Sequence, residues 1–156
     1  MENVMNVSVL NTVAEVELVC RPKVKPSQRP LVKSSKECYD ILLQNWDQNK
    51  IEFVEQFKVM LMNKGNRVLG ICELSTGGVS STVVDAKLVF VAALKANACN
   101  IILSHNHPSG NLKPSRQDEE LTVKIKEAGK FLDIQVLDHI IVTSEGYFSF
   151  GDEGLL

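Results

Sequence analysis

A short apolar run that ends in a pair of histidines is the feature that most limits how this chain can fold. The segment from Asn100 to Leu103 (NIIL) is rich in β-branched residues and predicts a buried, central strand. His105 and His107 follow at once, and residues two apart in an extended chain point to the same side. The fold must therefore bury a strand whose carboxyl end brings two imidazoles to one place.

A helix is predicted soon after this strand, from Ser115 to about Phe131. The intervening loop allows the chain to return, so that Asp118 at the helix start can join the two histidines. Two imidazoles and one carboxylate make three protein ligands, and three ligands with an open fourth position are typical of catalytic zinc. Ser115 and Asp118 also fit the Ser-x-x-acid pattern of a helix N-cap, so each has a purely structural interpretation when taken alone.

The remaining segments predict strands and helices in mixed order. An amphipathic helix is expected from Ser35, acting as N-cap, to about Asp47. Residues 55–63 and 67–74 predict a hairpin in which Gly65 supplies the turn. Further elements are expected at 13–19 (a strand), 85–97 (a buried helix capped by Asp85), 134–143 (a strand) and 147–150 (a short strand). This order predicts an α/β (α+β) sandwich, a mixed β-sheet flanked by helices.

The segment from Arg21 to Lys33 (RPKVKPSQRPLVK) is basic and rich in proline, which disfavours a regular element. It is interpreted either as an extended arm that crosses the domain or reaches a neighbouring chain, or as a solvated connector. Its charge makes it the one candidate for weak DNA contact. The expected organisation is an N-terminal strand and basic arm at 1–33 and a metal-binding domain at 34–156.

Composition limits the classes of protein to consider. The formal net charge of −2 gives no overall attraction for nucleic acid. The four cysteines form no CxxC pair, which argues against a zinc finger and against a disulfide framework. No segment approaches about 20 consecutive apolar residues, and the N-terminus lacks the pattern of a secretory signal. A cytoplasmic protein without membrane contact is therefore expected.

The histidine segment also resembles a known family. His105-Asn106-His107-Pro108, followed by Ser115 and Asp118 at the same spacing, is similar to the JAB/MPN (JAMM) metallopeptidase motif. The wider stretch ILSHNHPSGNLKPSRQDEEL, with VLDHIIVTSEGYFSF after it, resembles the RadC subfamily of that fold. The resemblance runs from about Glu55 to the C-terminus. It implies a cytidine-deaminase-like JAB/MPN fold, a Zn²⁺ ion bound by His105, His107 and Asp118, and a catalytic role for Ser115.

The same family requires an upstream glutamate as general base. Glu52, Glu55 and Glu73 are candidates, and Glu55 shares strand parity with Phe57, which begins an apolar face. In RadC-like sequences the glutamate directly precedes a Phe-containing strand, which again selects Glu55. Ser115 would stabilise an oxyanion and not act as nucleophile, because no histidine remains to activate it.

His139, the third histidine, fits a core residue or a contact of a metal ligand better than a ligand itself. The resulting prediction is a zinc-dependent metallopeptidase or isopeptidase acting on an unidentified peptide or isopeptide. The alternatives are a DNA-repair-associated accessory protein and a non-catalytic metal-binding interaction module. Longer RadC-like proteins carry a helix-hairpin-helix segment with no recognisable counterpart here, which weakens the DNA alternative. The residue pattern of a zinc deaminase is absent.

Overall fold

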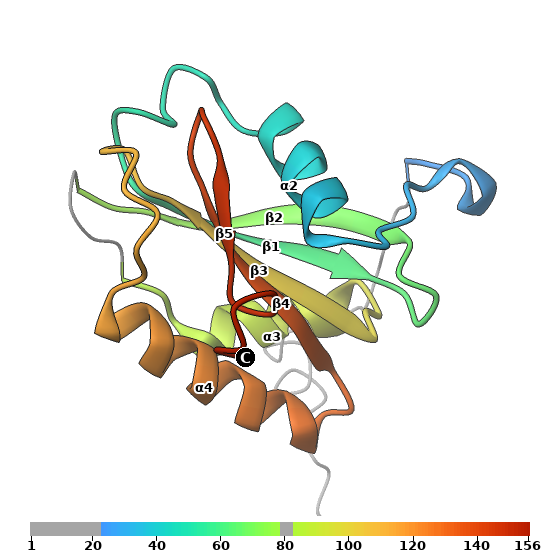
Figure 1. Ribbon diagram of the computed structural model, residues 1–156. Coiled ribbons are helices and arrows are strands. Elements are labelled where there is room, and N and C mark those ends of the chain that lie inside the picture. The colour runs from blue at the N-terminus through green and yellow to red at the C-terminus, as the bar shows by residue number, and fades with distance from the viewer. Residues whose placement is uncertain (1–22, 79–82) are drawn as a thin grey trace, which may run out of the picture.

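A five-stranded mixed sheet forms the centre of the molecule (Figure 1). The computed structural model describes residues 23–78 and 83–156, so the strand predicted at 13–19 lies outside the described residues. The strands run in the order β2-β1-β3-β4-β5, with β3 and β4 parallel and the other neighbours antiparallel. Their bounds are β1 Gln56–Met62, β2 Val68–Thr76, β3 Asn100–Asn106, β4 Gln135–Val142 and β5 Tyr147–Ser149. The predicted hairpin and the central position of β3 are confirmed.

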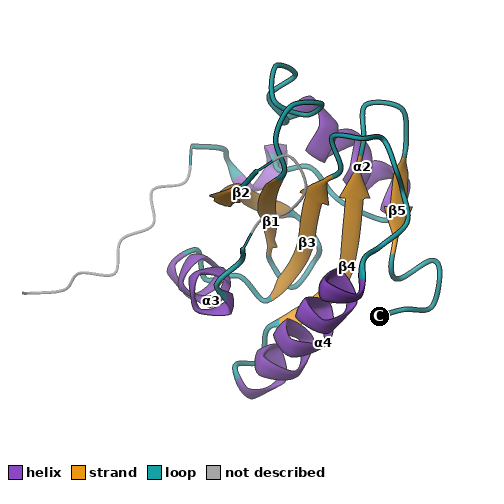
Figure 2. Cartoon of the chain, turned by 90° about the vertical axis from the view of Figure 1, so that its left-hand side faces the viewer, coloured by secondary structure: helices purple, strands orange, loops and turns teal. Residues whose placement is uncertain are grey.

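Helices cover both faces of the sheet, as Figure 2 shows. Helix α2 (Ser35–Gln44) lies on one face, where Leu42 packs in a core cluster with Met60 and Ile140. Helices α3 (Ala86–Lys95) and α4 (Arg116–Phe131) lie on the other, where a second cluster contains Val59 and Leu103. Alternate residues of β1 and β3 thus enter two separate cores, and the predicted α/β architecture is confirmed.

The N-cap of α2 is Ser34, and the prediction of Ser35 was wrong by one residue. The Ser34 side chain accepts a hydrogen bond from the Glu37 backbone N–H at 3.2 Å. The helix also ends earlier than predicted, because the Asn45 side chain donates to the Ile41 carbonyl at 2.8 Å. Since the last carbonyls of a helix have no intrahelical donor, a side chain that satisfies one of them favours termination there.

The turn between β1 and β2 also differs from the prediction. The prediction is that Gly65 supplies the turn, but Asn66, with φ of 58°, is the turn residue in the left-handed conformation. The Asn63 side-chain oxygen accepts from the backbone N–H groups of Gly65 and Arg67, both at 3.0 Å. Asparagine tolerates this conformation well, and a side-chain acceptor inside the turn holds it.

The described part of the basic arm packs against this turn. Leu31 forms an isolated antiparallel bridge with Arg67, and the Val68 N–H donates to the Pro30 carbonyl at 2.9 Å. One 3-10 turn, Pro26–Gln28, interrupts the otherwise irregular segment, since the fixed φ of proline suits a helix start. DNA contact through the arm stays a prediction.

The described ranges contain no helix that is long and apolar enough to cross a membrane. Cys38, Cys72 and Cys99 are free thiols, and burial raises the pKa of Cys38 to about 12.

We predict that Gly129→Ala destabilises the fold. A Cβ at Gly129, near the end of α4, would lie 2.3 Å from the Ile134 carbonyl oxygen, so the backbone before β4 would have to shift. Overpacking of this kind costs about 1–3 kcal/mol in unfolding free energy. Urea unfolding measures the effect, and Gly70→Ala is the control, because its Cβ meets no atom within 4 Å. Equal unfolding midpoints for the two variants would contradict the close approach.

Candidate metal centre

The predicted ligands meet where β3 ends and α4 begins. β3 and β4 are parallel and joined through α4, so the carboxyl ends of both strands and the amino end of the helix lie at the same end of the sheet. Ligand sites of open α/β sheets form at the carboxyl ends of the strands. β3 extends to Asn106, beyond the predicted end at Leu103. Its pairing with β4 continues one residue further, because the His107 N–H donates to the Val142 carbonyl, and this pairing fixes the backbone of both histidines.

His105, His107 and Asp118 form a compact group. The two histidine Nε2 atoms lie 3.0 Å apart, and Asp118 Oδ1 lies 3.4 Å from His105 Nε2. Asp118 Oδ2 lies 3.9 Å from His107 Nε2. One ligand atom from each residue falls within 4.8 Å of the others. Ligands about 2.0–2.1 Å from a tetrahedral ion lie roughly 3.3 Å from one another, so these separations suit a single metal ion.

Helix α4 fixes the position of Asp118 through a capping box. The Ser115 hydroxyl accepts from the Asp118 backbone N–H at 3.2 Å, while the Ser115 N–H donates to Asp118 Oδ2 at 2.7 Å. The Ser115 hydroxyl also donates to the same carboxylate oxygen at 2.7 Å. The capping interpretation is thus confirmed for both residues, and the carboxylate that completes the cap also faces the histidines.

The environment of Asp118 favours its charged form. Partial burial raises the pKa of this carboxyl, but hydrogen bonding and charge at His105, together with the hydrogen bonds from Ser115, outweigh burial and hold the pKa well below its usual range. The carboxylate is therefore ionised at neutral pH, as a metal ligand must be. His105 is only 1% exposed and Asp118 16%, so the group is largely shielded from solvent but remains partly accessible at Asp118.

The protonation of His107 follows from its partner. His107 Nδ1 lies 2.6 Å from the backbone carbonyl oxygen of Asn111. A carbonyl oxygen can only accept, so Nδ1 carries the proton and the lone pair of the neutral ring is on Nε2. That lone pair faces His105 and Asp118. The loop after β3 thus orients His107 for metal binding.

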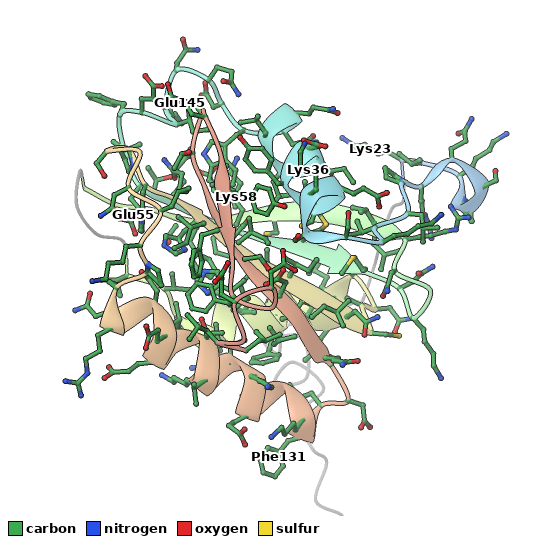
Figure 3. All side chains as sticks on the ribbon, in the orientation of Figure 1. Lys23, Lys36, Glu55, Lys58, Phe131 and Glu145 are labelled. Atoms are coloured by element: carbon green, nitrogen blue, oxygen red, sulfur yellow. The ribbon has the colours of Figure 1, made fainter. Side chains whose placement is uncertain are left out.

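Glu55, labelled in Figure 3, lies directly before β1 and shares the parity of Phe57, which is opposite His105 in the neighbouring strand. In the antiparallel pair of β1 and β3, Phe57 is opposite His105, and the same register carried two residues further sets Glu55 opposite His107. The Glu55 residue is 8% exposed, and its backbone bonds with Gly77 and Gly78 hold it in an extended conformation. The geometry agrees with the sequence-based choice, and its catalytic role stays a prediction.

The two other glutamate candidates are bound elsewhere. Glu52 accepts a hydrogen bond from the Ser144 hydroxyl at 2.6 Å, in the loop after β4. Glu73, on β2, accepts from Gln56 at 2.8 Å and lies 3.5 Å from Lys58 Nζ. Neither shares the face of His105 through the β1–β3 register, which leaves Glu55 as the candidate base.

Asn106 is a residue of this region that the sequence interpretation missed. Its side-chain nitrogen donates to the carbonyls of Ile51 and Val54 at 2.7 and 2.9 Å, and its oxygen accepts from the Gln56 N–H at 2.7 Å. The bonds to Val54 and Gln56 fix the chain on both sides of Glu55. A buried amide between two histidines in a strand was the available signal, because such a group needs several hydrogen bonds.

His139 lies beneath His105, on β4. Its Nε2 is 2.8 Å from His105 Nδ1, and its ring stacks on Phe150 with centroids 4.6 Å apart. Complete burial lowers the pKa of His139 well below its usual value, so its imidazole is neutral at pH 7. The structure thus places it as a contact of a candidate ligand, which is one of the two roles that the sequence favoured.

The comparison with known families agrees with this geometry. The family described as "RadC-like JAB domain" matches residues 32–155, which is most of the chain. The chain therefore belongs to the RadC-like JAB domain family, and the RadC resemblance predicted from the HNHP segment is confirmed.

Curated relatives extend the comparison without adding an activity. A UPF0758 protein of Flavobacterium johnsoniae is 48% identical over 101 residues, covering 65% of this chain and 44% of the relative. UPF0758 proteins of Rubrobacter xylanophilus and Porphyromonas gingivalis are 46% and 44% identical over similar shares. The chain thus spans less than half the length of these relatives, and their name specifies no reaction.

We predict that the wild-type protein binds zinc and that the double variant His105→Ala/His107→Ala does not. Removal of two of three ligands leaves only Asp118, which binds a divalent ion weakly by itself. Plasma mass spectrometry of the purified proteins measures zinc per chain. Arg116→Ala is the matched control on α4, because the Arg116 side chain is 90% exposed and its guanidinium bonds to Glu120 and not to a candidate ligand. Equal metal content in all three proteins would refute the site.

A second prediction separates the capping role of Ser115 from any catalytic one. Ser115→Ala removes the side-chain acceptor of the Asp118 N–H, and loss of an N-cap costs about 1 kcal/mol in unfolding free energy. Ser115→Thr retains a hydroxyl and is expected to unfold near the wild-type denaturant concentration. Guanidinium unfolding with a metal chelator present compares the apo proteins. An unchanged midpoint for Ser115→Ala would show that the cap contributes nothing.

Proposed function

We propose that this chain is a zinc-dependent hydrolase of the JAMM type, a metallopeptidase or isopeptidase in which His105, His107 and Asp118 hold the ion. The observation that carries the proposal is the convergence of three candidate ligand atoms at the carboxyl end of β3, with the buried Glu55 on the same face of the sheet. Two neutral imidazole nitrogens and a carboxylate oxygen are a donor set that zinc favours, and three protein ligands leave a position for water.

The chemistry divides between the ion and the residues around it. Zinc in such a site lowers the pKa of a water ligand toward neutrality and polarises a carbonyl group. Glu55 would accept a proton as water adds to the carbonyl carbon of an amide, and would donate it to the nitrogen as the C–N bond breaks. Burial and the backbone bonds on both sides keep Glu55 in one place for these two transfers.

The proposed catalytic role of Ser115 requires its hydroxyl to change hydrogen-bond partner. Its hydroxyl would donate to the oxyanion that forms at the carbonyl oxygen, but in the present structure it donates to Asp118 Oδ2. The catalytic role therefore requires the hydroxyl to turn from the carboxylate to the substrate. The hydroxyl would meanwhile still accept from the Asp118 N–H, so the cap can persist during this change.

We predict that Glu55→Gln abolishes hydrolysis and retains zinc. Loss of a general base lowers the rate by about 10²–10⁴-fold, whereas Glu55 is not one of the three ligands. The assay follows cleavage of a peptide library and of lysine-isopeptide peptides by mass spectrometry, beside zinc content.

Glu52→Gln is the control for this experiment, because Glu52 contacts Ser144 in the loop after β4. Hydrolysis by wild-type protein and Glu52→Gln but not by Glu55→Gln supports the proposal. Undiminished hydrolysis by Glu55→Gln would rule out its assignment as the base. A wild-type protein that binds zinc and cleaves none of the probes would favour the non-catalytic binding module.

A further inference from the structure

His105 offers its Nε2 atom to a metal only if its ring proton is on Nδ1. A neutral imidazole carries one proton, and the ring cannot bind a cation through the nitrogen that holds it. For His107, the Asn111 carbonyl decides the tautomer. For His105 the partner is His139, a second imidazole that can either donate or accept. The tautomer of His105 therefore depends on the tautomer of His139, which another contact must fix.

The hydroxyl group of Thr122 fixes the tautomer of His139. Thr122 lies on α4 one turn after Asp118, and its hydroxyl donates to the Asp118 backbone carbonyl at 2.6 Å. A carbonyl only accepts, so the single proton of the hydroxyl is used there. Thr122 Oγ1 is also 2.6 Å from His139 Nδ1, and in that contact the hydroxyl can only accept. His139 Nδ1 therefore carries the proton of its neutral ring.

The direction of the remaining bonds follows from this. With its proton on Nδ1, His139 presents a lone pair on Nε2, 2.8 Å from His105 Nδ1. His105 Nδ1 must then donate, so Nε2 is the nitrogen left to face the other candidate ligand atoms, 3.0 Å from His107 Nε2 and 3.4 Å from Asp118 Oδ1. Burial makes the direction firm, because Thr122 and His139 are 1% and 0% exposed and water cannot replace either partner.

We infer that Thr122 and His139 are positioning residues that fix His105 in its metal-binding tautomer, through a directed chain of hydrogen bonds from the Asp118 backbone carbonyl. The chain begins at one ligand residue and ends at another, so it joins α4 to β3 beneath the site. His139 is also held between Phe57 and Phe150, whose rings lie 5.8 and 4.6 Å from it, centroid to centroid. This inference rests on the proposed metal site and not on the reaction.

Thr122→Val and Thr122→Ser form a test that separates hydrogen bonding from packing. Valine keeps the shape of threonine and removes the hydroxyl, so His139 Nδ1 loses its acceptor. The favourable response is for His139 to move its proton to Nε2 and donate to His105, which then carries its own proton on Nε2. Serine keeps the hydroxyl and removes only a methyl group. A purely packing role would make serine the more harmful change, whereas the inferred role makes it valine.

Two measurements that need no substrate decide the outcome. Long-range ¹H–¹⁵N spectra of the metal-free protein report the tautomer of each imidazole, and the chain has only three histidines. Zinc affinity is measured by competition with a chromophoric chelator. We expect His105 protonated on Nδ1 in the wild type and in Thr122→Ser. In Thr122→Val we expect the Nε2-protonated form of His105 and a zinc affinity weaker by about 10–100-fold.

His139→Phe supplies an independent variant, since it retains an aromatic ring between Phe57 and Phe150 and removes the acceptor of His105. It is expected to weaken zinc binding to a similar extent. The inference is overturned if wild-type His105 carries its proton on Nε2, or if valine and serine at position 122 have equal effects. A protein that binds zinc as expected and hydrolyses nothing would refute the proposed function and leave this inference intact.

Discussion

The burial of three consecutive polar side chains at the end of β3 is the constraint on which the site depends. Ser104, His105 and Asn106 are each at most 1% exposed, so each needs partners from the protein. Ser104 donates to the Lys58 carbonyl at 3.0 Å, His105 contacts His139, and Asn106 bonds to the segment before β1. An unsatisfied buried polar group costs roughly 1–3 kcal/mol, so these bonds bring the neighbouring elements to fixed positions around the strand end.

Asp118 shows how stability and chemistry share one side chain. Its carboxylate completes the capping box of α4 with Ser115 and also faces the two histidines. The helix start is positive in character and carries two hydrogen-bond donors to the carboxylate, which favours the charged form. The same contacts that begin the helix therefore keep a candidate metal ligand ionised.

Much of this arrangement was accessible from the sequence, because it depends on local patterns. The alternation around Phe57 and the apolar run before His105 predicted the strands and the common parity of Glu55 and Phe57, and the β1–β3 register then sets Phe57 opposite His105. The Ser-x-x-acid spacing predicted the start of α4, and the Asp85 cap of α3 is confirmed. These features arise from residues that are neighbours in the chain, so periodicity and capping rules detect them.

The contacts that were missed join residues distant in the chain. Asn106 meets Ile51 across 55 positions, and His139 meets His105 across 34. The partner of His139 depends on the register of β3 and β4, which shifts between Ile101 and Ile102. The sequence indicated that His139 is a core residue or a contact of a metal ligand, but no local pattern encodes the register shift that determines its partner. The same limit applies to Ser34 and Asn66, where neighbouring residues of similar type competed for one position.

The alternation of β3 finally explains why two histidines flank an asparagine. Successive side chains of a strand point to opposite faces, so His105 enters the α3–α4 side while Asn106 points to the other. On that side its bonds to Val54 and Gln56 hold the backbone around Glu55, whose own side chain returns to the face of His105. A displacement of β1 relative to β3 would thus break the Asn106 bonds before it separated Glu55 from the ligands. The spacing between the candidate base and the candidate metal site is therefore set by the middle residue of the motif, whose side chain points away from that site.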